Sequence, residues 1–271
     1  MNLIAEIGIN HNGDIAICKK LISIAKLSGF NYVKIQKRNP DVCVPEEQKL
    51  KIRDTPWGKI TYLDYKKKIE FNEKQIIELI VYSNKLDIVF FASVWDNDSV
   101  DIMSKHSHIG KIPSALITDL ELCKYARKYF KTLIISTGMS TEQEIQSCIN
   151  ACNPDIIMHS NSTYPCPPQD LNLRYIEWLK VKNPTKEIGY SGHESGIITT
   201  LATIPMGVSW IERHITLDKQ MWGSDQKASL DIQEMFELVK NINIIKDACQ
   251  YIPQERIQFE TENIKKLSLR K

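Results

Sequence analysis

Residues 132–159 read TLIISTGMSTEQEIQSCINACNPDIIMH, and this stretch indicates the fold class of the chain. The apolar runs 132–136 and 155–159 predict two strands. Between them, Thr141 and Glu144 fit a capping box, which favours the start of a helix. The apolar side chains that follow recur at the helical period, at Ile145, Cys148, Ile149 and Cys152. We therefore predict a strand–helix–strand unit here.

The same alternation runs along the rest of the chain. Asp14 can cap an earlier helix, which Gly29 ends. Further apolar runs bring the predicted number of strands to eight: residues 3–7, 32–35, 88–92, 108–112, 187–190 and 208–215. Strictly alternating strands and helices predict a parallel sheet with helical crossovers. Eight such units in about 250 residues predict the α/β class and a (β/α)8 TIM barrel, with an open doubly wound sheet as the alternative.

Composition narrows the class of protein. The 271 residues carry 35 Lys and Arg against 33 Asp and Glu, and this net charge of +2 argues against bulk binding to nucleic acid. No apolar run approaches the length that spans a membrane. The acidic Glu6 comes too early for a signal peptide. Seven scattered cysteines show no zinc or disulfide spacing, which favours reduced thiols and a cytoplasmic location.

Domain organisation follows from the strand count. We expect residues 1–250 to form the catalytic barrel and residues 251–271 to be a C-terminal extension packed on it, without a separate domain. One interval, residues 37–71, is long for a loop and carries several prolines and aromatic residues. Loops of this length are usually functional or locally folded, so a lid and a surface excursion are weighed evenly.

Polar residues close most of the predicted strands. In a (β/α)8 barrel the active site lies at the carboxyl ends of the strands, so these side chains should share one mouth. The set comprises Glu6, Lys34, Gln36, Ser93, Lys111, Ser114, Ser136, His159, Ser162, Tyr164, Ser191, His193, Glu212 and His214. Two lysines among several hydroxyls suit a phosphate or a carboxylate. The alternative is a buried ion pair between Glu6 and Lys34 that serves the structure only.

Two histidines end the seventh and eighth predicted strands. His193 and His214 should lie close together because these strands are neighbours in a barrel. Two imidazoles with open positions suit a divalent transition metal. His11 and His159 are alternative partners, and a hydrogen-bonded wall histidine is the alternative to a ligand.

At these strand ends the sequence resembles the sialic acid synthase (N-acetylneuraminate synthase) family. The matching motifs are AEIGINHNG at 5–13, KIQ at 34–36, ASVWD at 92–96, KIPS at 111–114, ISTGM at 135–139, HSNSTYP at 159–165, GYSGH at 189–193, IERHITLD at 211–218 and GSDQ at 223–226. They occur in order, and each falls at a predicted strand end or in the loop after the last strand. An ordered set of this kind is far more specific than any single motif.

The resemblance implies an enzyme, a transferase that forms a carbon–carbon bond. It would condense phosphoenolpyruvate with an aldose such as N-acetylmannosamine, giving a 2-keto-3-deoxy sugar acid such as a sialic acid and releasing phosphate. By the same resemblance, the residues that hold phosphoenolpyruvate are Lys34, Ser93, Lys111, Ser114, Ser136, Ser162 and Ser191, and those around the sugar and the attacking water are Glu6, Gln36, Tyr164 and Asp225. Glu6, Asp225 and Lys111 are the candidate catalytic residues.

The resemblance also implies a cofactor and a partner. His193 and His214 match ligands of a divalent metal, most often Mn²⁺, with Mg²⁺ or Co²⁺ as alternatives. Family enzymes commonly carry a further antifreeze-like domain that reaches the active site of a partner subunit. Only 21 residues follow the expected closing helix, so a barrel-only member is expected, and a homodimer is compatible with the resemblance.

Some sugar-side positions depart from the family pattern. Gly192 stands where many members carry Asp, Gln226 where His often follows the Asp, and Leu116 near a position that holds Glu in acylamino-sugar synthases. The pattern therefore indicates retained chemistry with an altered acceptor. An octulosonate-type synthase of the same barrel class is the near alternative. A non-catalytic sugar-binding barrel and a metal-dependent hydrolase or aldolase are weaker alternatives.

Overall fold

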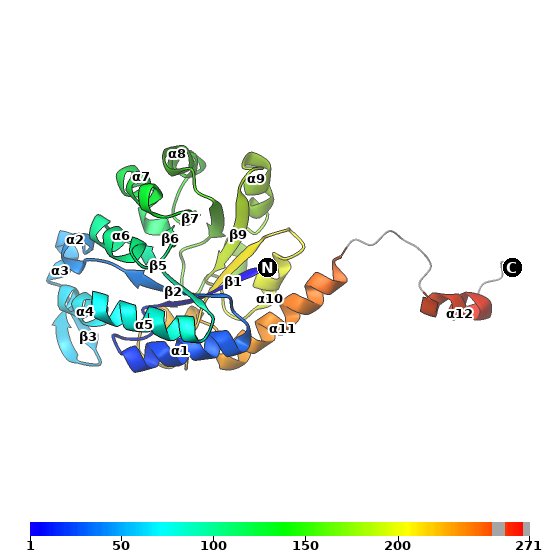
Figure 1. Cartoon of the computed structure of the whole chain (residues 1–271), viewed down its shortest axis with the longest axis horizontal. Coiled ribbons are helices and arrows are strands. Elements are labelled where there is room, and N and C mark those ends of the chain that lie inside the picture. The colour runs from blue at the N-terminus through cyan, green and yellow to red at the C-terminus, as the bar shows by residue number, and fades with distance from the viewer. Residues whose placement is uncertain (251–257, 268–271) are drawn as a thin grey trace.

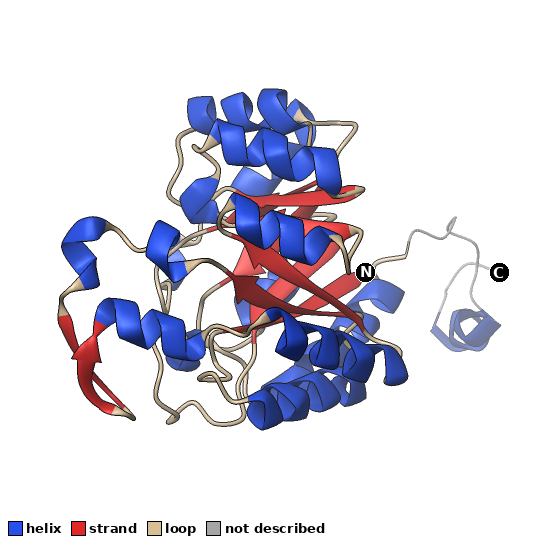
Figure 2. Cartoon of the chain, turned by 60° about the vertical axis from the view of Figure 1, so that its left-hand side comes forward, coloured by secondary structure: helices blue, strands red, loops and turns tan. Residues whose placement is uncertain are grey.

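The apolar runs of the sequence form the strands of a closed barrel. The computed structural model describes residues 1–250 and 258–267. Eight parallel strands close in the order β1-β10-β9-β8-β7-β6-β5-β2, and helices surround them (Figures 1 and 2). β1 pairs with both β2 and β10, so the sheet has no free edge. The predicted TIM barrel is confirmed, and the open-sheet alternative is wrong.

The strands agree with the predicted runs to within a few residues. They are β1 (Asn2–Gly8), β2 (Tyr32–Lys37), β5 (Val89–Val94), β6 (Ile109–Ile112), β7 (Thr132–Ser136), β8 (Ile156–Ser160), β9 (Glu187–Gly192) and β10 (Trp210–His214). Every residue of β6, β8 and β10 is buried, as expected for a parallel sheet that helices cover.

Helices surround the barrel, and most of them begin at a residue whose side chain caps the helix. They are α1 (Ile15–Ser28), α5 (Glu73–Lys85), α6 (Asn97–Ser104), α7 (Leu120–Tyr129), α8 (Glu142–Cys152), α9 (Tyr175–Lys182), α10 (Ile198–Ala202) and α11 (Ile232–Ala248). Asp14 accepts hydrogen bonds from two backbone amides of α1, and Gly29 ends that helix in the left-handed conformation. Both bonds of the predicted Thr141–Glu144 capping box are present.

The barrel interior is layered from apolar to polar. A cluster of buried side chains fills its lower part: Ile4, Phe91, Ile109, Ile134, Ile156, Met158 and Trp210. Side chains two residues further along a strand point to the same face, nearer its carboxyl end. In this way Ile4 is followed by Glu6, Ile109 by Lys111, and Trp210 by Glu212. The strand period therefore places charged side chains directly above this apolar cluster.

The long interval after β2 is folded rather than irregular. It contains α2 (Pro40–Cys43), α3 (Glu46–Lys49), the antiparallel strands β3 (Ile52–Thr55) and β4 (Gly58–Thr61), and α4 (Tyr62–Ile69). Figure 2 shows the hairpin standing outside the barrel. Val42 on α2 and Tyr62 on α4 line the cavity at the barrel mouth. The helices of the segment thus contribute to the wall of that cavity, whereas its hairpin is largely exposed, so the segment is neither wholly a lid nor wholly a surface excursion.

The remaining described segment is helix α12 (Gln258–Leu267), whose described side chains are mostly exposed. The expected packing of residues 251–271 on the barrel stays a prediction, since 251–257 and 268–271 lie outside the described residues. In the part of the chain that the structure describes, no helix is long and apolar enough to cross a membrane. All seven cysteines are free thiols, as their spacing predicts.

Candidate active site

One cavity of about 660 Å³ opens at the carboxyl ends of the barrel strands. All thirteen residues to which the sequence assigned a role line it: Glu6, Lys34, Gln36, Ser93, Lys111, Ser114, Ser136, Ser162, Tyr164, Ser191, His193, His214 and Asp225. The strands β1, β2, β5, β6, β7, β9 and β10 or the loops after them supply these side chains, and the loop after β8 supplies Ser162 and Tyr164. Closure of the barrel is what gathers residues that lie far apart in the chain.

Ion pairs form the floor of this cavity. Lys34 Nζ lies 2.6 Å from Glu6 Oε2 and 3.5 Å from Glu212 Oε1. Lys111 Nζ lies 2.8 Å from the same oxygen of Glu212. All four side chains are buried. The buried Glu6–Lys34 pair weighed from the sequence is therefore present, and it stands inside the cavity rather than away from it.

The charges of the floor balance one another. Burial alone would raise the pKa of Glu212, but Lys111 and Lys34 lower it to about 2. Burial lowers the pKa of Lys111, and Glu212 opposes that shift. The floor thus holds two buried lysines and two buried carboxylates, and each charge is stabilised by the opposite charges beside it.

Hydroxyl groups surround the two lysines. Ser93 Oγ accepts a hydrogen bond of 2.7 Å from Lys34 Nζ, and Ser191 Oγ donates to Glu212 at 3.3 Å. Ser136 Oγ is buried and has no hydrogen-bond partner among the described residues. A buried hydroxyl without a partner is costly, and Ser136 Oγ can donate a hydrogen bond to a ligand that enters the cavity.

Gly138 brings two further serines together. A Cβ atom at this position would lie 2.4 Å from Ser162 Oγ and 2.9 Å from Ser114 Oγ, and Ser114 already accepts a hydrogen bond from the Gly138 amide. The bare backbone thus lets both hydroxyls approach the cavity wall.

For the phosphoenolpyruvate that the family resemblance implies, we expect the Gly138→Ala substitution to raise KM roughly tenfold or more, because both hydroxyls must move by a sizeable part of an ångström. The melting temperature should change little, since the displaced side chains can turn into the cavity. Steady-state kinetics with thermal unfolding as a control would check this. An unchanged KM would show that these serines do not contact the substrate.

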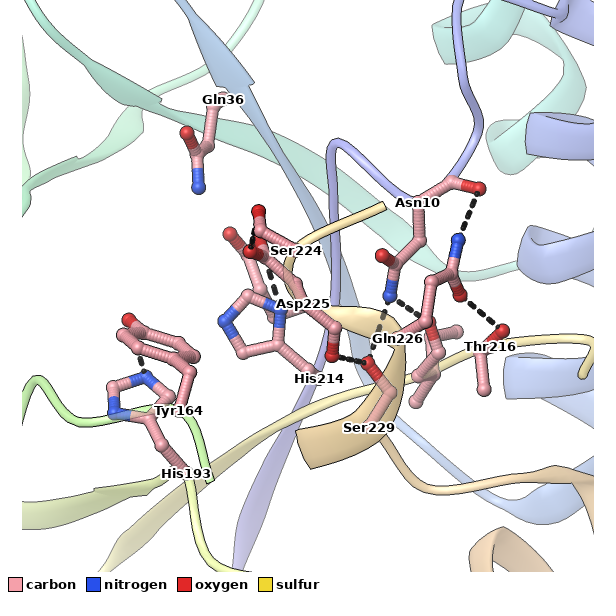
Figure 3. A network of polar contacts seen from close by, with 12 residues as sticks. Asn10, Gln36, Tyr164, His193, His214, Thr216, Ser224, Asp225, Gln226 and Ser229 are labelled. Atoms are coloured by element: carbon pink, nitrogen blue, oxygen red, sulfur yellow. Dashed lines mark hydrogen bonds and ion pairs between the residues drawn. The ribbon is translucent and has the colours of Figure 1, made fainter. Parts of the chain in front are cut away.

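His193 is held in one orientation (Figure 3). Its Nδ1 bonds to the carbonyl oxygen of Asn161, which can only accept, so Nδ1 carries the proton. Nε2 therefore presents a lone pair, which accepts a hydrogen bond of 3.0 Å from Tyr164 Oη. Burial and the nearby His214 lower the pKa of His193 to about 3, so the ring is neutral at physiological pH. A backbone-anchored neutral imidazole is typical of metal-binding histidines.

His214 supplies the second imidazole. The two rings lie 5.4 Å apart between centroids, and His214 Nδ1 is buried without a hydrogen-bond partner among the described residues. Gly8 makes room for this ring, since a Cβ there would lie 3.2 Å from His214 Cε1. Over the described ranges, no group of three or more His, Cys, Asp or Glu side chains is arranged as a complete metal site. Two nitrogen donors fit a divalent cation that takes its other ligands from substrate and water.

Asp225 faces the histidines from the loop after β10. Its Oδ2 lies 3.9 Å from His214 Nδ1, and its side chain also accepts a hydrogen bond from Ser224. The next residue, Gln226, is fully buried, and its amide accepts from Thr216 and donates to the carbonyl of Asn10. Figure 3 shows this network behind Asp225. Gln226, which departs from the family pattern, thus fixes the loop that presents Asp225.

The second departure, Gly192, also has a physical reason. A Cβ atom at 192 would lie 2.5 Å from Glu194 Oε2 and 2.6 Å from the Tyr190 ring. Glu194 is itself fixed, because it accepts hydrogen bonds from Tyr190 and Arg213 in the interior. An Asp side chain could not be placed here without moving this network. Leu116, the third departure, lines the cavity.

Sequence reasoning did not assign roles to several residues that line the cavity. Glu212 was included among the strand-end residues but was given no role. Its alternation with His214 indicates that both side chains face inward. Arg38 continues the alternation of Lys34 and Gln36 past the end of β2, and this signal was available. No sequence signal marks Lys66 on α4, because nothing in the sequence indicates which face of that short helix meets the barrel. His159 lies in a neighbouring hollow instead, and its Nε2 hydrogen-bonds to the carbonyl of Leu171.

The chain is similar to a known family, to named relatives and to solved structures. The model described as "NeuB family" matches residues 21–252. The N,N'-diacetyllegionaminic acid synthase of Campylobacter jejuni is 36% identical over 97% of this chain and 81% of its own length. The N-acetylneuraminate-9-phosphate synthase of Drosophila melanogaster is 35% identical over 94% of this chain and 70% of its own. An N-acetylneuraminic acid synthetase from Leptospira borgpetersenii, solved with citrate, is 29% identical and superposes with a TM-score of 0.86 over 99% of this chain and 92% of that one.

Proposed function

Since this chain belongs to the NeuB family, we propose that it condenses phosphoenolpyruvate with an aldose to give a 2-keto-3-deoxy sugar acid of the nonulosonic type. Relatives that share a third of its residues are named as synthases of such acids. The observation that carries the proposal is the floor of the cavity, where Lys34 and Lys111 are buried among serine hydroxyls. Buried cations with hydroxyl donors suit a small ligand that carries both a phosphate and a carboxylate.

The reaction balances without an oxidant or reductant. The enol carbon of phosphoenolpyruvate attacks the aldehyde carbon, and positive charge develops on the carbon that bears the phosphate ester. Water adds to that carbon, and the tetrahedral intermediate breaks its bond to the ester oxygen, so inorganic phosphate leaves. The water oxygen becomes the ketone oxygen, one water proton ends on the new hydroxyl, and the other on phosphate.

The chain's own residues have definite parts in this scheme. Lys34 and Lys111 bind the anionic groups of phosphoenolpyruvate, with the serines as further donors. Glu6 is placed in the floor to stabilise the developing positive charge, and Asp225 at the mouth to move a proton to or from the water. A divalent cation held by His193 and His214 supplies Lewis acidity to the aldehyde oxygen when bound, and Mn²⁺ is the ion that we propose.

The proposal predicts a specific pattern of phosphate release. With Mn²⁺ present, purified protein should release inorganic phosphate only when phosphoenolpyruvate and an aldose are both supplied. Mass spectrometry of the product should show the summed mass of the two substrates and water less phosphate, and this mass separates a nonulosonate from an octulosonate. If phosphoenolpyruvate is not consumed with any aldose of a neutral and anionic panel, the proposed function is wrong.

A further inference from the structure

Helix α4 carries a buried cation that the proposed condensation does not use. Lys66 is only 8% exposed, and its side chain lines the cavity. Its Nζ lies 5.2 Å from the ring centroids of both Tyr62 and Tyr65. Among the described residues these two rings are the only contacts of Lys66 Nζ, which forms neither a hydrogen bond nor an ion pair. Its Nζ faces the cavity, and no carboxylate of the described residues lies within ion-pair distance of it, so an anionic ligand in the cavity would supply the missing close counter-charge.

The surroundings of Lys66 hold an excess of positive charge. Arg38, which is 5% exposed, also lines the cavity, and its Nε lies 2.9 Å from Glu70 Oε1. Lys37 Nζ lies 3.5 Å from the other oxygen of the same carboxylate. One carboxylate therefore serves two cations, and Lys66 adds a third. Asp225 is near enough to raise the pKa of Lys66, but the two side chains form no ion pair, and the closest charged contact of Asp225 is His214 Nδ1 at 3.9 Å.

This positive excess lies away from the floor. On β2 and just beyond it, Lys34, Gln36 and Arg38 alternate and all line the cavity, and Arg38 donates a hydrogen bond to Gln36. Four residues of extended chain span roughly 13 Å at about 3.3 Å each. Lys34 binds phosphoenolpyruvate in the proposed function, so the far end of a second substrate reaches toward Arg38 and Lys66. The Arg38 guanidinium also stacks on Trp95 at 4.4 Å, which fixes its position.

We propose that the acceptor aldose carries an anionic group remote from its aldehyde, and that Lys66 binds this group with Arg38 beside it. The group is a phosphate ester or a carboxylate, the two anions common on sugars. This inference rests on the proposed function, because it assumes that the floor holds phosphoenolpyruvate. It assigns the charge of the second substrate, which the family membership leaves open.

The test compares three acceptors and two variants. The acceptors are a neutral aldose, its phosphate ester at the terminal carbon, and the matching uronic acid. Wild-type enzyme should have the highest kcat/KM with one of the two anionic acceptors, and which one it prefers identifies the anion. Lys66→Met should raise KM for that acceptor at least about tenfold, as expected for one lost charge-assisted hydrogen bond. Lys68→Met removes the same charge from an exposed position of α4 outside the cavity and should leave the preference intact.

The outcomes separate the two proposals. A preference for the neutral aldose, or equal KM values in wild type and Lys66→Met, overturns the anionic acceptor and leaves the synthase assignment standing. Absence of turnover with every acceptor overturns the synthase instead. In that case calorimetric binding of the phosphate ester and of the uronic acid to wild type and to Lys66→Met still tests the lysine: weaker binding of either to the variant supports the site, and equal binding of both refutes it.

The pH dependence of the acceptor preference distinguishes a lysine that binds the substrate from one that has only a structural role. The pKa of Lys66 is lowered to about 8. Burial is the largest cause, and Arg38 and Arg53 also lower the pKa, whereas Asp225 and Glu70 raise it. An anion binds the protonated amine, so the preference for the charged over the neutral acceptor should decline as the pH rises through about 8. Lys66→Arg keeps its charge at this pH and should abolish the decline. A wild-type preference that is constant from pH 7 to about 9 would contradict the assignment.

Discussion

Replacement of Lys111 by Met is expected to lower kcat/KM for phosphoenolpyruvate by about a hundredfold to a thousandfold. Lys111 is buried in the floor of the cavity, and its Nζ lies 2.8 Å from Glu212. A neutral methionine carries no charge and donates no hydrogen bond, so an anionic substrate would lose the attraction that this amine provides. Steady-state kinetics with phosphate release as the signal would measure the loss.

A double variant separates this effect from simple destabilisation. Lys111→Met leaves Glu212 with one cation in place of two, and an under-compensated buried carboxylate lowers stability. Adding Glu212→Gln restores the charge balance of the floor. We expect the melting temperature to recover in the double variant while activity stays low. If activity recovered together with stability, Lys111 would be a structural residue rather than one that binds the substrate.

The second large effect is expected from the paired histidines. His193→Ala with His214→Ala should abolish metal-dependent turnover, a loss of at least about a thousandfold, because the Lewis-acid contribution amounts to several kcal/mol. Metal content after dialysis against Mn²⁺ should fall with the activity. Both rings line the cavity, so small side chains there leave space rather than a clash.

His106→Ala is the matched control for the pair. His106 lies outside the cavity, with Nε2 at 3.6 Å from Glu73, so the variant should retain both metal and activity. A histidine-pair variant that turns over at the wild-type rate without bound metal would refute the proposed role of these two residues.

Much of the fold could be predicted because local and tertiary signals agree. Thr141 and Glu144 cap α8 as their spacing predicts, and Gly29 ends α1. Strands in a closed parallel barrel are buried on both faces, so they appear as short apolar runs. The hairpin at 52–61 gave no such signal, because β3 is almost wholly exposed and has no apolar alternation.

The site was predictable only where it follows the barrel. Side chains at strand ends must meet at one mouth, and so all thirteen assigned residues line one cavity. Lys66 could not be found in this way, because α4 belongs to the interval between β2 and α5 and not to a strand end. The ion pairs of the floor, such as Lys111 with Glu212, depend on strand register and side-chain rotamers, which cannot be deduced from a single sequence.

The folded interval 37–71 and the floor of the cavity differ in how freely their residues can change. The floor is built from strands whose register the whole barrel fixes, so a change there disturbs many neighbours. The wall that carries Lys66 belongs to a single connection between β2 and α5, and doubling the length of such a connection costs only about 0.6 kcal/mol in closure entropy. The connection does not supply the floor, but it packs on other loops of the barrel mouth, since Tyr65 contacts Trp222 after β10 and Phe71 stacks on His11 after β1. If Lys66 binds the acceptor as proposed, exchange of this connection together with the loops that it contacts should change the second substrate and leave the reaction the same.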